Sequence, residues 1–289
     1  MINYIIYISL NIFSFILACF PRKIVLYFGR AIGFLLYYIF PIRKKVAFKN
    51  LNIVFPAKDS VEINKIIFKS YMHYGLLIME FIRNATVRVK EKSYNINKDT
   101  INILKDSKGL IFMTAHMGNW EMVIPIISKY KKMMAVVRDQ NNSGGNKFFY
   151  KARNYKNTTL IASSGSKKEM IKSLYDNSLL ALASDQNTRK RGVMIDFFGK
   201  GASIPKGAGH FHYQTKSKVV IGFCILNKEL NYDFHLEYLN IEKYNIEQKD
   251  KLIVKVCELY VKKLEKIIMQ YPEQYFWFHK KWDKDIYAS

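Results

Sequence analysis

A histidine and a glutamate, His116 and Glu121, stand five positions apart in the stretch GLIFMTAHMGNWE. The apolar run 110–113 is typical of a buried strand, and Gly118 and Asn119 interrupt the chain beyond it. This pattern predicts a strand ending just before His116, a tight turn, and a helix capped by Asn119. A carboxylate beside a histidine can orient the ring and stabilise the imidazolium, so the pair suits a general base. A lone histidine near a strand is, however, more often a hydrogen-bonded core or surface residue.

Strand-like and helix-like segments alternate along most of the chain. This alternation predicts an α/β fold with a mainly parallel central sheet flanked by helices. The strands are expected at 110–113, 133–137, 158–162, 179–183, 218–226 and 233–239. The helices are expected at 60–83, with Ser60 as N-cap, and at 120–129, 145–155, 166–177, 207–215 and 248–269. Residues 87–97 are polar and are expected to form an extended excursion.

Reactive groups in such folds gather beyond the carboxyl ends of the strands. Polar residues follow four of the predicted strands, namely His116, Arg138-Asp139, Ser163-Ser164 and Asp185-Gln186. Arg153, on the helix between the second and third of these strands, is expected to point toward the same region. Together these residues predict a cleft for an anionic substrate. Taken singly, each arginine could be a solvated surface charge, and Asp185 a turn or helix cap.

Residues 189–209 combine a basic opening with several glycines. We expect a loop here, with Ile195, Phe197, Phe198 and Ile204 exposed to contact something both apolar and anionic. The segment lacks the spacing of a phosphate-binding P-loop or of a dinucleotide-binding turn.

The composition of the 289-residue chain is that of a folded protein, with 49% hydrophobic residues. Lys and Arg total 46 against 23 Asp and Glu, a net charge of +23. This excess favours polyanionic partners: nucleic acid, an anionic membrane, an acidic carrier protein or a phosphorylated substrate. The three cysteines are widely spaced and the histidines form no ligand cluster, so we expect no disulfide framework, metal or cofactor, and a reducing compartment.

The first 45 residues form a hydrophobic segment that we expect to attach the catalytic domain, 46–289, to a membrane. Residues 2–20 are almost continuously apolar, close to the length that crosses a bilayer core of about 30 Å. Residues 24–40 carry Arg30 in mid-run, which favours an interfacial or domain-packed helix. The basic cluster at 43–49 suits a cytoplasmic membrane face. Two alternatives stay open: buried core helices, and surface-lying instead of spanning attachment.

Several sequence blocks now identify a resemblance. AHMGNWE, with His116 and Glu121, resembles the H-x4-[DE] motif of glycerolipid acyltransferases. Its HxGNWE form is similar to the late acyltransferases of lipid A biosynthesis, the lauroyl and myristoyl transferases. Asp185-Gln186-Asn187 resembles their DQ block, and Phe197-Phe198-Gly199 their FFG segment. The tail PEQYFWFHKKW, residues 272–282, resembles their C-terminal ending, and the likeness spans nearly the whole chain.

The resemblance implies a glycerol-3-phosphate acyltransferase-like fold and transfer of a fatty acyl group from acyl carrier protein. The acceptor would be a hydroxyl of a lipid A precursor, a phosphorylated glycolipid, at the cytoplasmic face of the inner membrane. In this reading His116 is the general base and Glu121 orients its ring, with turn amides or an arginine stabilising the oxyanion. Arg138, Arg153 and Gln186 would bind or position substrate. Asp185 would either orient another residue of the site from behind or contact the acceptor.

Two rival functions remain open on the sequence alone. One is an acyltransferase of the same fold that acts on a lysophospholipid, an aminolipid or a glycosylated phosphoinositide, with acyl carrier protein or acyl-CoA as donor. The other is a basic protein that binds a membrane or nucleic acid without chemistry. The second gives no reason for HMGNWE, DQ and PEQYFW to occur in series, so we expect no nucleic-acid partner.

Overall fold

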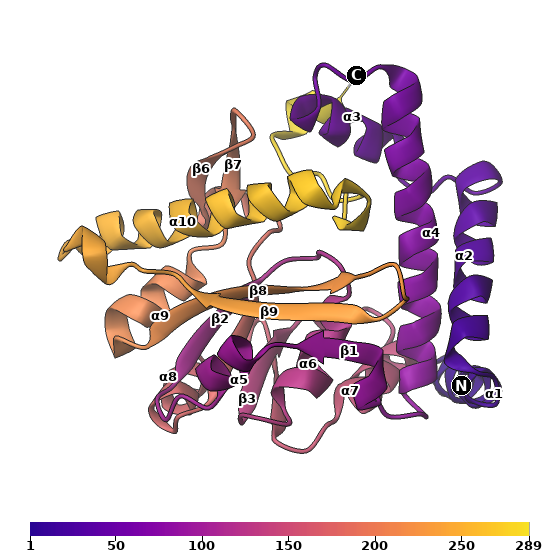
Figure 1. Cartoon of the computed structure of the whole chain (residues 1–289), viewed down its shortest axis with the longest axis horizontal. Coiled ribbons are helices and arrows are strands. Elements are labelled where there is room, and N and C mark those ends of the chain that lie inside the picture. Colours follow the sequence, from indigo (N-terminus) through magenta and orange to yellow (C-terminus); the bar gives the residue numbers. More distant parts are fainter. Residues whose placement is uncertain (289) are drawn as a thin grey trace.

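A seven-stranded sheet lies at the centre of the structure, a computed structural model that describes residues 1–288 (Figure 1). Its strand order is β1-β9-β8-β2-β5-β3-β4, and all neighbouring strands are parallel except β8 and β9. This confirms the predicted α/β fold with a mostly parallel sheet between helices. The strands are β1 (Tyr94–Ile96), β2 (Leu110–Thr114), β3 (Met133–Val137), β4 (Thr158–Ala162), β5 (Leu179–Ala183), β8 (Lys218–Leu226) and β9 (Tyr232–Tyr238).

Helices surround the sheet, and short 3-10 turns join several of them. The helices are α1 (Ile2–Ala18), α2 (Arg22–Tyr38), α3 (Lys44–Val54), α4 (Ser60–Asn84), α5 (Lys98–Leu104), α6 (Val123–Ile127), α7 (Ser143–Arg153), α8 (Lys167–Tyr175), α9 (Gly207–Thr215) and α10 (Lys249–Gln270). The 3-10 turns are η1 (Glu91–Ser93), η2 (Trp120–Met122), η3 (Arg189–Arg191), η4 (Glu242–Tyr244), η5 (Pro272–Gln274) and η6 (Lys284–Tyr287).

The register between β2 and β5 places two distant parts of the sequence side by side. The pairs run from Leu110 opposite Leu179 to Thr114 opposite Ala183, so both strands end at the same level. Every residue of β2 is buried, as expected for a central parallel strand. The residues that leave these two strands therefore emerge together at the carboxyl edge of the sheet.

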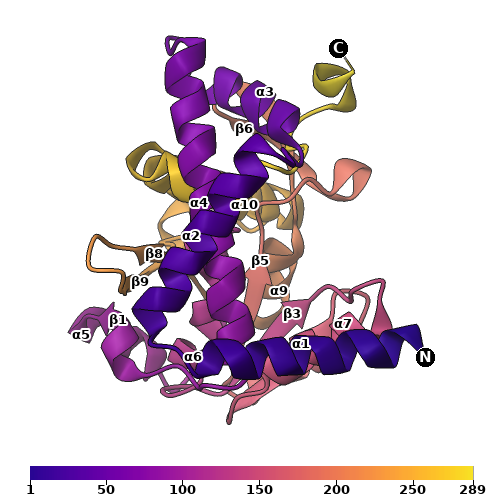
Figure 2. The same ribbon diagram turned by 90° about the vertical axis from the view of Figure 1, so that its right-hand side faces the viewer.

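Helix α4 stands across that carboxyl edge, with α2 packed on its outer side (Figures 1 and 2). α4 begins with a capping box in which Asp59, one residue before the expected Ser60, accepts from the Glu62 amide. The two helices approach closely because small residues line their contact. A Cβ added to Gly33 would lie 2.3 Å from the Tyr71 carbonyl oxygen, so only glycine fits there.

The two apolar N-terminal segments are helical, as predicted. α2 contributes Leu26 to the main core, while many other side chains of α1 and α2 stay exposed. Among residues 1–288, none of the helices combines the length and the apolar character needed to cross a bilayer. The division of the chain at residue 45 stays a prediction.

Two segments differ from their predicted structure. Residues 193–197 (β6) and 200–204 (β7) form an antiparallel hairpin instead of a loop. The side chains of Ile195, Phe197 and Ile204 are buried, so the expectation that they are exposed was wrong. Within 87–97, β1 adds a parallel edge strand beside β9. The strands of the hairpin are five residues each and β1 is three residues long, which is too short for a clear sequence period.

Candidate active site

The turn after β2 is held by its backbone. Gly118 has φ +59°, and a Cβ there would lie 2.0 Å from the Cys224 carbonyl oxygen, so the turn requires glycine. The Gly118 amide donates to the Gln274 carbonyl at 2.9 Å, and the Asn119 amide to that of Cys224 at 2.7 Å. The Asn119 side chain makes no capping hydrogen bond, contrary to our prediction. The turn thus presents His116 from a fixed backbone.

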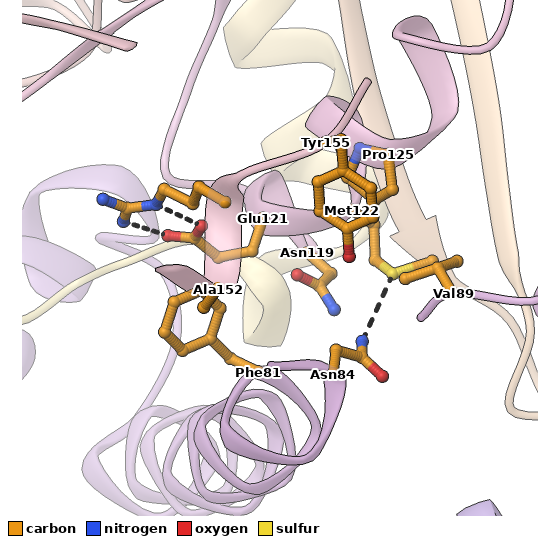
Figure 3. A pocket seen from close by; sticks show the side chains of 10 residues that line it. Phe81, Asn84, Val89, Asn119, Glu121, Met122, Pro125, Ala152 and Tyr155 are labelled. Atoms are coloured by element: carbon orange, nitrogen blue, oxygen red, sulfur yellow. Dashed lines mark hydrogen bonds and ion pairs between the residues drawn. The ribbon is translucent and has the colours of Figure 1, made fainter. Parts of the chain in front are cut away.

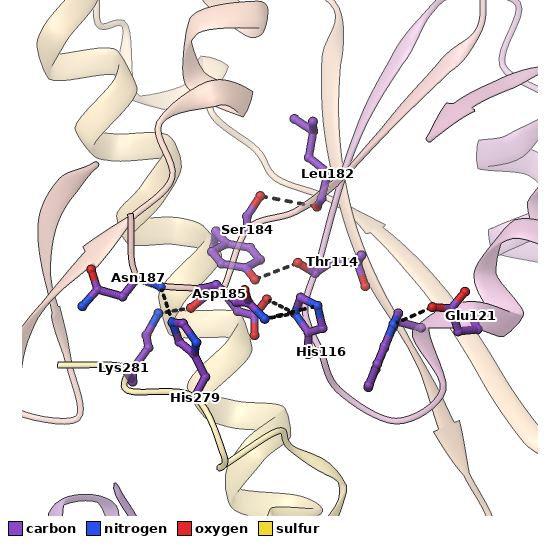
Figure 4. Close-up of polar contacts among 12 residues, drawn as sticks. Thr114, His116, Glu121, Leu182, Ser184, Asp185, Asn187, His279 and Lys281 are labelled. Carbon is purple, nitrogen blue, oxygen red and sulfur yellow. Dashed lines mark hydrogen bonds and ion pairs between the residues drawn. The ribbon is translucent and has the colours of Figure 1, made fainter. Parts of the chain in front are cut away.

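His116 is hydrogen-bonded to Asp185, the residue just beyond the end of β5. The His116 Nδ1 atom lies 2.8 Å from Asp185 Oδ1 (Figure 4). The Asp185 side chain is 3% exposed, whereas that of His116 is 23% exposed. The carboxylate is therefore hidden behind an imidazole that solutes can reach. Of the two roles left open for Asp185, the structure shows the orienting contact, which the resemblance had implied for Glu121.

The two groups shift each other's protonation. Burial alone would lower the pKa of His116, but the charge and hydrogen bond of Asp185 raise it above its ordinary value. Burial would raise the pKa of Asp185, but His116 and then Lys281 hold it below its ordinary value. Because an ionised Asp185 can only accept, Nδ1 of a neutral His116 carries the proton and Nε2 keeps a lone pair. Nε2 is thus the atom able to take a proton.

Gln186 lies against the outer part of the His116 ring. Its side-chain nitrogen is 3.4 Å from Nε2 and 3.5 Å from Nδ1 of His116. The side chain is half-buried. The Gln186 amide thus lies close to both nitrogens of the His116 ring, and its role in substrate binding stays a prediction.

Glu121 points away from Asp185 and pairs with Arg153. Figure 4 shows Asp185 and Glu121 on opposite sides of His116, and Figure 3 shows the double contact of Glu121 with an arginine. Arg153 Nε donates to Glu121 Oε2 at 2.8 Å, and Nη2 to Oε1 at 2.6 Å. The Trp120 indole also donates to Oε1, at 3.0 Å, and its ring packs on His116 with centroids 4.9 Å apart. Glu121 thus supports the histidine through Trp120.

Breaking the Glu121–Arg153 pair is expected to destabilise the fold. Both side chains are about six-sevenths buried, at 16% and 14% exposed, and Arg153 also packs on the rings of Phe81 and Phe149. Glu121→Ala leaves this guanidinium without its carboxylate and should lower the free energy of unfolding by about 3 kcal/mol. Urea denaturation followed by tryptophan fluorescence measures it.

An exposed ion pair with the same 2.6 Å separation provides the control. Lys263 and Glu237 lie 2.6 Å apart but are 41% and 53% exposed, so Glu237→Ala should cost less than about 1 kcal/mol. Equal losses in the two alanine variants would contradict a structural role for the Glu121 pair.

The C-terminal segment 272–282 forms the wall facing this turn. The Phe276 amide donates to the His116 carbonyl at 2.9 Å, and its ring lies 6.1 Å from the His116 ring. Lys281 donates to the backbone carbonyl of Asp185, and the Asn187 amide donates to His279 Nε2 at 3.3 Å (Figure 4). The sequence pattern predicts no physical role for Phe276, His279 or Lys281. A lysine inside an aromatic run was the signal available for Lys281.

Two expected contributions are not seen. The amides of Gly118 and Asn119 already donate to backbone carbonyls, so they cannot also serve an oxyanion as we had suggested. Arg138 is exposed at the end of β3, and within residues 1–288 it contacts neither His116 nor Asp185. Its role in substrate binding stays a prediction. So does that of Arg153, where an anionic substrate would have to compete with Glu121.

Two pockets of the described residues lie on the Glu121 side of the turn. A small cavity beside Glu121 and Arg153 shares the lining residues Val89, Pro125 and Tyr155 with a pocket of about 630 Å³. Neither is lined by His116. Within the described part of the chain, no three His, Cys, Asp or Glu side chains are grouped to hold a metal ion. The site is therefore defined by its polar contacts.

Comparison with known proteins shows the family of the chain. Residues 1–284 match the family described as bacterial lipid A biosynthesis acyltransferase. The chain is 21% identical over 273 residues to the lipid A biosynthesis palmitoleoyltransferase of Escherichia coli (strain K12), covering 90% of this chain and 85% of that protein. The lipid A biosynthesis acyltransferase of Shigella flexneri matches to the same extent. The chain belongs to the bacterial lipid A biosynthesis acyltransferase family.

Proposed function

We propose that this protein transfers a fatty acyl group from acyl carrier protein to a hydroxyl of a lipid A precursor, with His116 as the general base. The observation that carries the proposal is the His116–Asp185 hydrogen bond at the carboxyl ends of β2 and β5. It leaves a partly exposed imidazole with a basic Nε2 atom.

The reaction needs no covalent intermediate. Nε2 of His116 takes the proton of the acceptor hydroxyl while the oxygen attacks the thioester carbonyl carbon. The tetrahedral intermediate then collapses, the carbon–sulfur bond breaks, and the imidazolium returns its proton to the departing sulfur, which leaves as a thiol. Asp185 accepts from Nδ1 throughout and stabilises the imidazolium.

The Gln186 amide is our choice for the oxyanion donor. Its nitrogen lies 3.4 Å from His116 Nε2, so an acyl group in reach of the attacked hydroxyl would also be in reach of this donor. The Gly118 and Asn119 amides are engaged, and Arg153 is paired with Glu121. A preorganised donor at such a position is typical of enzymes that stabilise tetrahedral intermediates.

The charge and apolar surface of the chain suit the proposed partners. Acyl carrier proteins are acidic, and the net charge of +23 would accelerate their encounter with this chain. Most of the exposed large apolar side chains of residues 1–288 lie within 1–42. Together with the basic residues at 43–49, they favour attachment to an anionic membrane, which we place at the cytoplasmic face of the inner membrane.

The decisive experiment supplies donors and acceptors together. The purified protein is incubated with acyl carrier proteins loaded with chains of several lengths and with a lipid A precursor, and the lipids are analysed by mass spectrometry. Gain of one acyl mass on the precursor supports the proposal. Parallel reactions contain acyl-CoA as donor or a lysophospholipid as acceptor. Transfer only in those would replace the proposed substrates, and no transfer in any would reject the proposed activity.

If the protein attaches to membranes through α1, an exposed aromatic residue on α1 should contribute more to membrane binding than an equally exposed one on another helix. Phe15 on α1 and Tyr175 on α8 are both 63% exposed. Phe15→Glu should weaken binding to vesicles of phosphatidylethanolamine and phosphatidylglycerol about tenfold, since burying such a side chain is worth about 1.5–3 kcal/mol. Tyr175→Glu should leave binding unchanged. Co-sedimentation measures both, and an equal effect of the two substitutions would count against attachment through α1.

A further inference from the structure

Lys281 is a buried cation directly behind the His116–Asp185 pair. Its side chain belongs to a residue only 2% exposed, and its ammonium donates to the backbone carbonyl of Asp185. The same ammonium lies 4.9 Å from the centre of the Phe197 ring. In Figure 4, Lys281 and His279 lie on the side of Asp185 away from Glu121. The lysine therefore touches the residue that orients the base, without touching the base.

A charge in this position is costly and calls for a reason. Burial lowers the pKa of Lys281 to about 8, and the charge of Asp185 limits that fall. Replacing buried ions with apolar residues is often neutral or stabilising, so stability alone is a weak reason to bury this ammonium. Asp185 itself is fully enclosed, and Lys281 is one of the groups that keep its carboxylate ionised.

We propose that Lys281 is a positioning residue whose ammonium fixes the charge of the His116–Asp185 pair and so sets the pH range in which His116 accepts a proton. The inference rests on the proposed function, in which His116 is the base. Without the ammonium, the negative charge of Asp185 is less compensated, and the pair holds its proton more tightly. The pair should then lose that proton only at higher pH.

Other charged and titratable groups around the pair come from several elements, and all are kept in the test. They are Tyr74 of α4, Glu121 of η2, Arg153 of α7, Tyr260 of α10, and Tyr275 and His279 of the C-terminal segment. Lys281 itself contacts the backbone of Asp185. Removing its ammonium therefore removes a positive charge next to the buried Asp185 carboxylate.

The experiment measures the His116 pKa and acyl transfer in the same variants. Lys281→Met removes both charge and donor, Lys281→Gln removes the charge and keeps a donor, and Lys281→Arg keeps the charge. Lys280→Met removes an exposed charge one residue away and is the control. Histidine imidazoles labelled with 15N are titrated by NMR, with the His116 signals identified by their loss in His116→Gln. The acid limb of kcat/KM is recorded in parallel.

In the neutral variants, Lys281→Met and Lys281→Gln, the pKa of His116 should rise by about one unit. The midpoint of the acid limb of kcat/KM should move to higher pH by about the same amount. Lys281→Arg and Lys280→Met should leave both unchanged. Folded neutral variants with an unshifted titration would overturn the proposal, even with reduced turnover. So would failure of both to fold while Lys281→Arg folds normally, since Lys281 would then be a folding residue. The NMR titration needs no substrate, so it decides about Lys281 even if no acyl transfer is found.

Discussion

His116→Ala is expected to lower kcat for acyl transfer by about 10²- to 10⁴-fold, the range that general bases contribute. The substitution removes Nε2, the atom that accepts the proton of the hydroxyl. The ring contacts with Trp120 and Phe276 are lost, but the Phe276 amide still donates to the backbone carbonyl of residue 116, and Lys281 remains beside Asp185, so the fold should persist. Initial rates with saturating donor and acceptor measure the loss, and circular dichroism and a thermal melt establish folding.

His235→Ala is the matched control, because His235 is an exposed histidine on β9. It should keep full activity. The pH profile of the unsubstituted enzyme adds a second check. Only neutral His116 can act as a base, so kcat/KM should rise with pH through a pKa above the ordinary histidine value of about 6.5. Near-normal turnover in His116→Ala, or a profile independent of pH in this range, would refute the assigned role.

The elements that position His116 could be predicted from the sequence. The apolar runs gave the six longer strands of the sheet to within a residue or two at each end, and alternation with helices gave their mainly parallel arrangement. His116, Asp185 and Gln186 all follow the ends of predicted strands, which predicted that they lie close together. In the structure, His116 contacts both Asp185 and Gln186. These features are predictable because the period of a buried strand and the polarity of its end are local properties of the sequence.

The partner of the histidine was not predictable in the same way. Glu121 is near His116 in sequence, but the fixed turn at Gly118 and the 3-10 turn that follows direct it toward Arg153. Asp185 lies 69 positions from His116 and becomes its neighbour only because β5 pairs with β2. Strand order is a tertiary property, and several orders are compatible with one alternating pattern.

The buried hairpin β6–β7 illustrates the same limit. Its glycines and basic residues favoured an exposed loop, yet Phe197 is fully buried and packs 5.6 Å from the Trp282 ring. The partner that covers Phe197 comes from the far end of the chain. Contacts between residues this far apart in the sequence are not visible in a local pattern. The pattern of the C-terminal segment therefore predicts no role for its residues.

Asp185→Asn is expected to lower kcat by about 10²- to 10⁴-fold, whereas Glu121→Gln should change it less than about tenfold. Asparagine fits the space of Asp185, but its amide can donate to His116 Nδ1. The ring proton then moves to Nε2, which can no longer accept one. Glutamine at position 121 keeps an oxygen for Arg153, so the turn should stay in place.

The pH profile separates a lost charge from a distorted site. The Asp185 charge raises the His116 pKa, so its removal should move the acid limb of the remaining activity to lower pH. Removing the Lys281 charge should move it in the opposite direction. Steady-state rates across pH for Asp185→Asn and Glu121→Gln therefore test the proposed division of roles directly. A greater loss in Glu121→Gln than in Asp185→Asn would return the orienting role to Glu121, because only the group that holds Nδ1 controls which nitrogen can accept the proton.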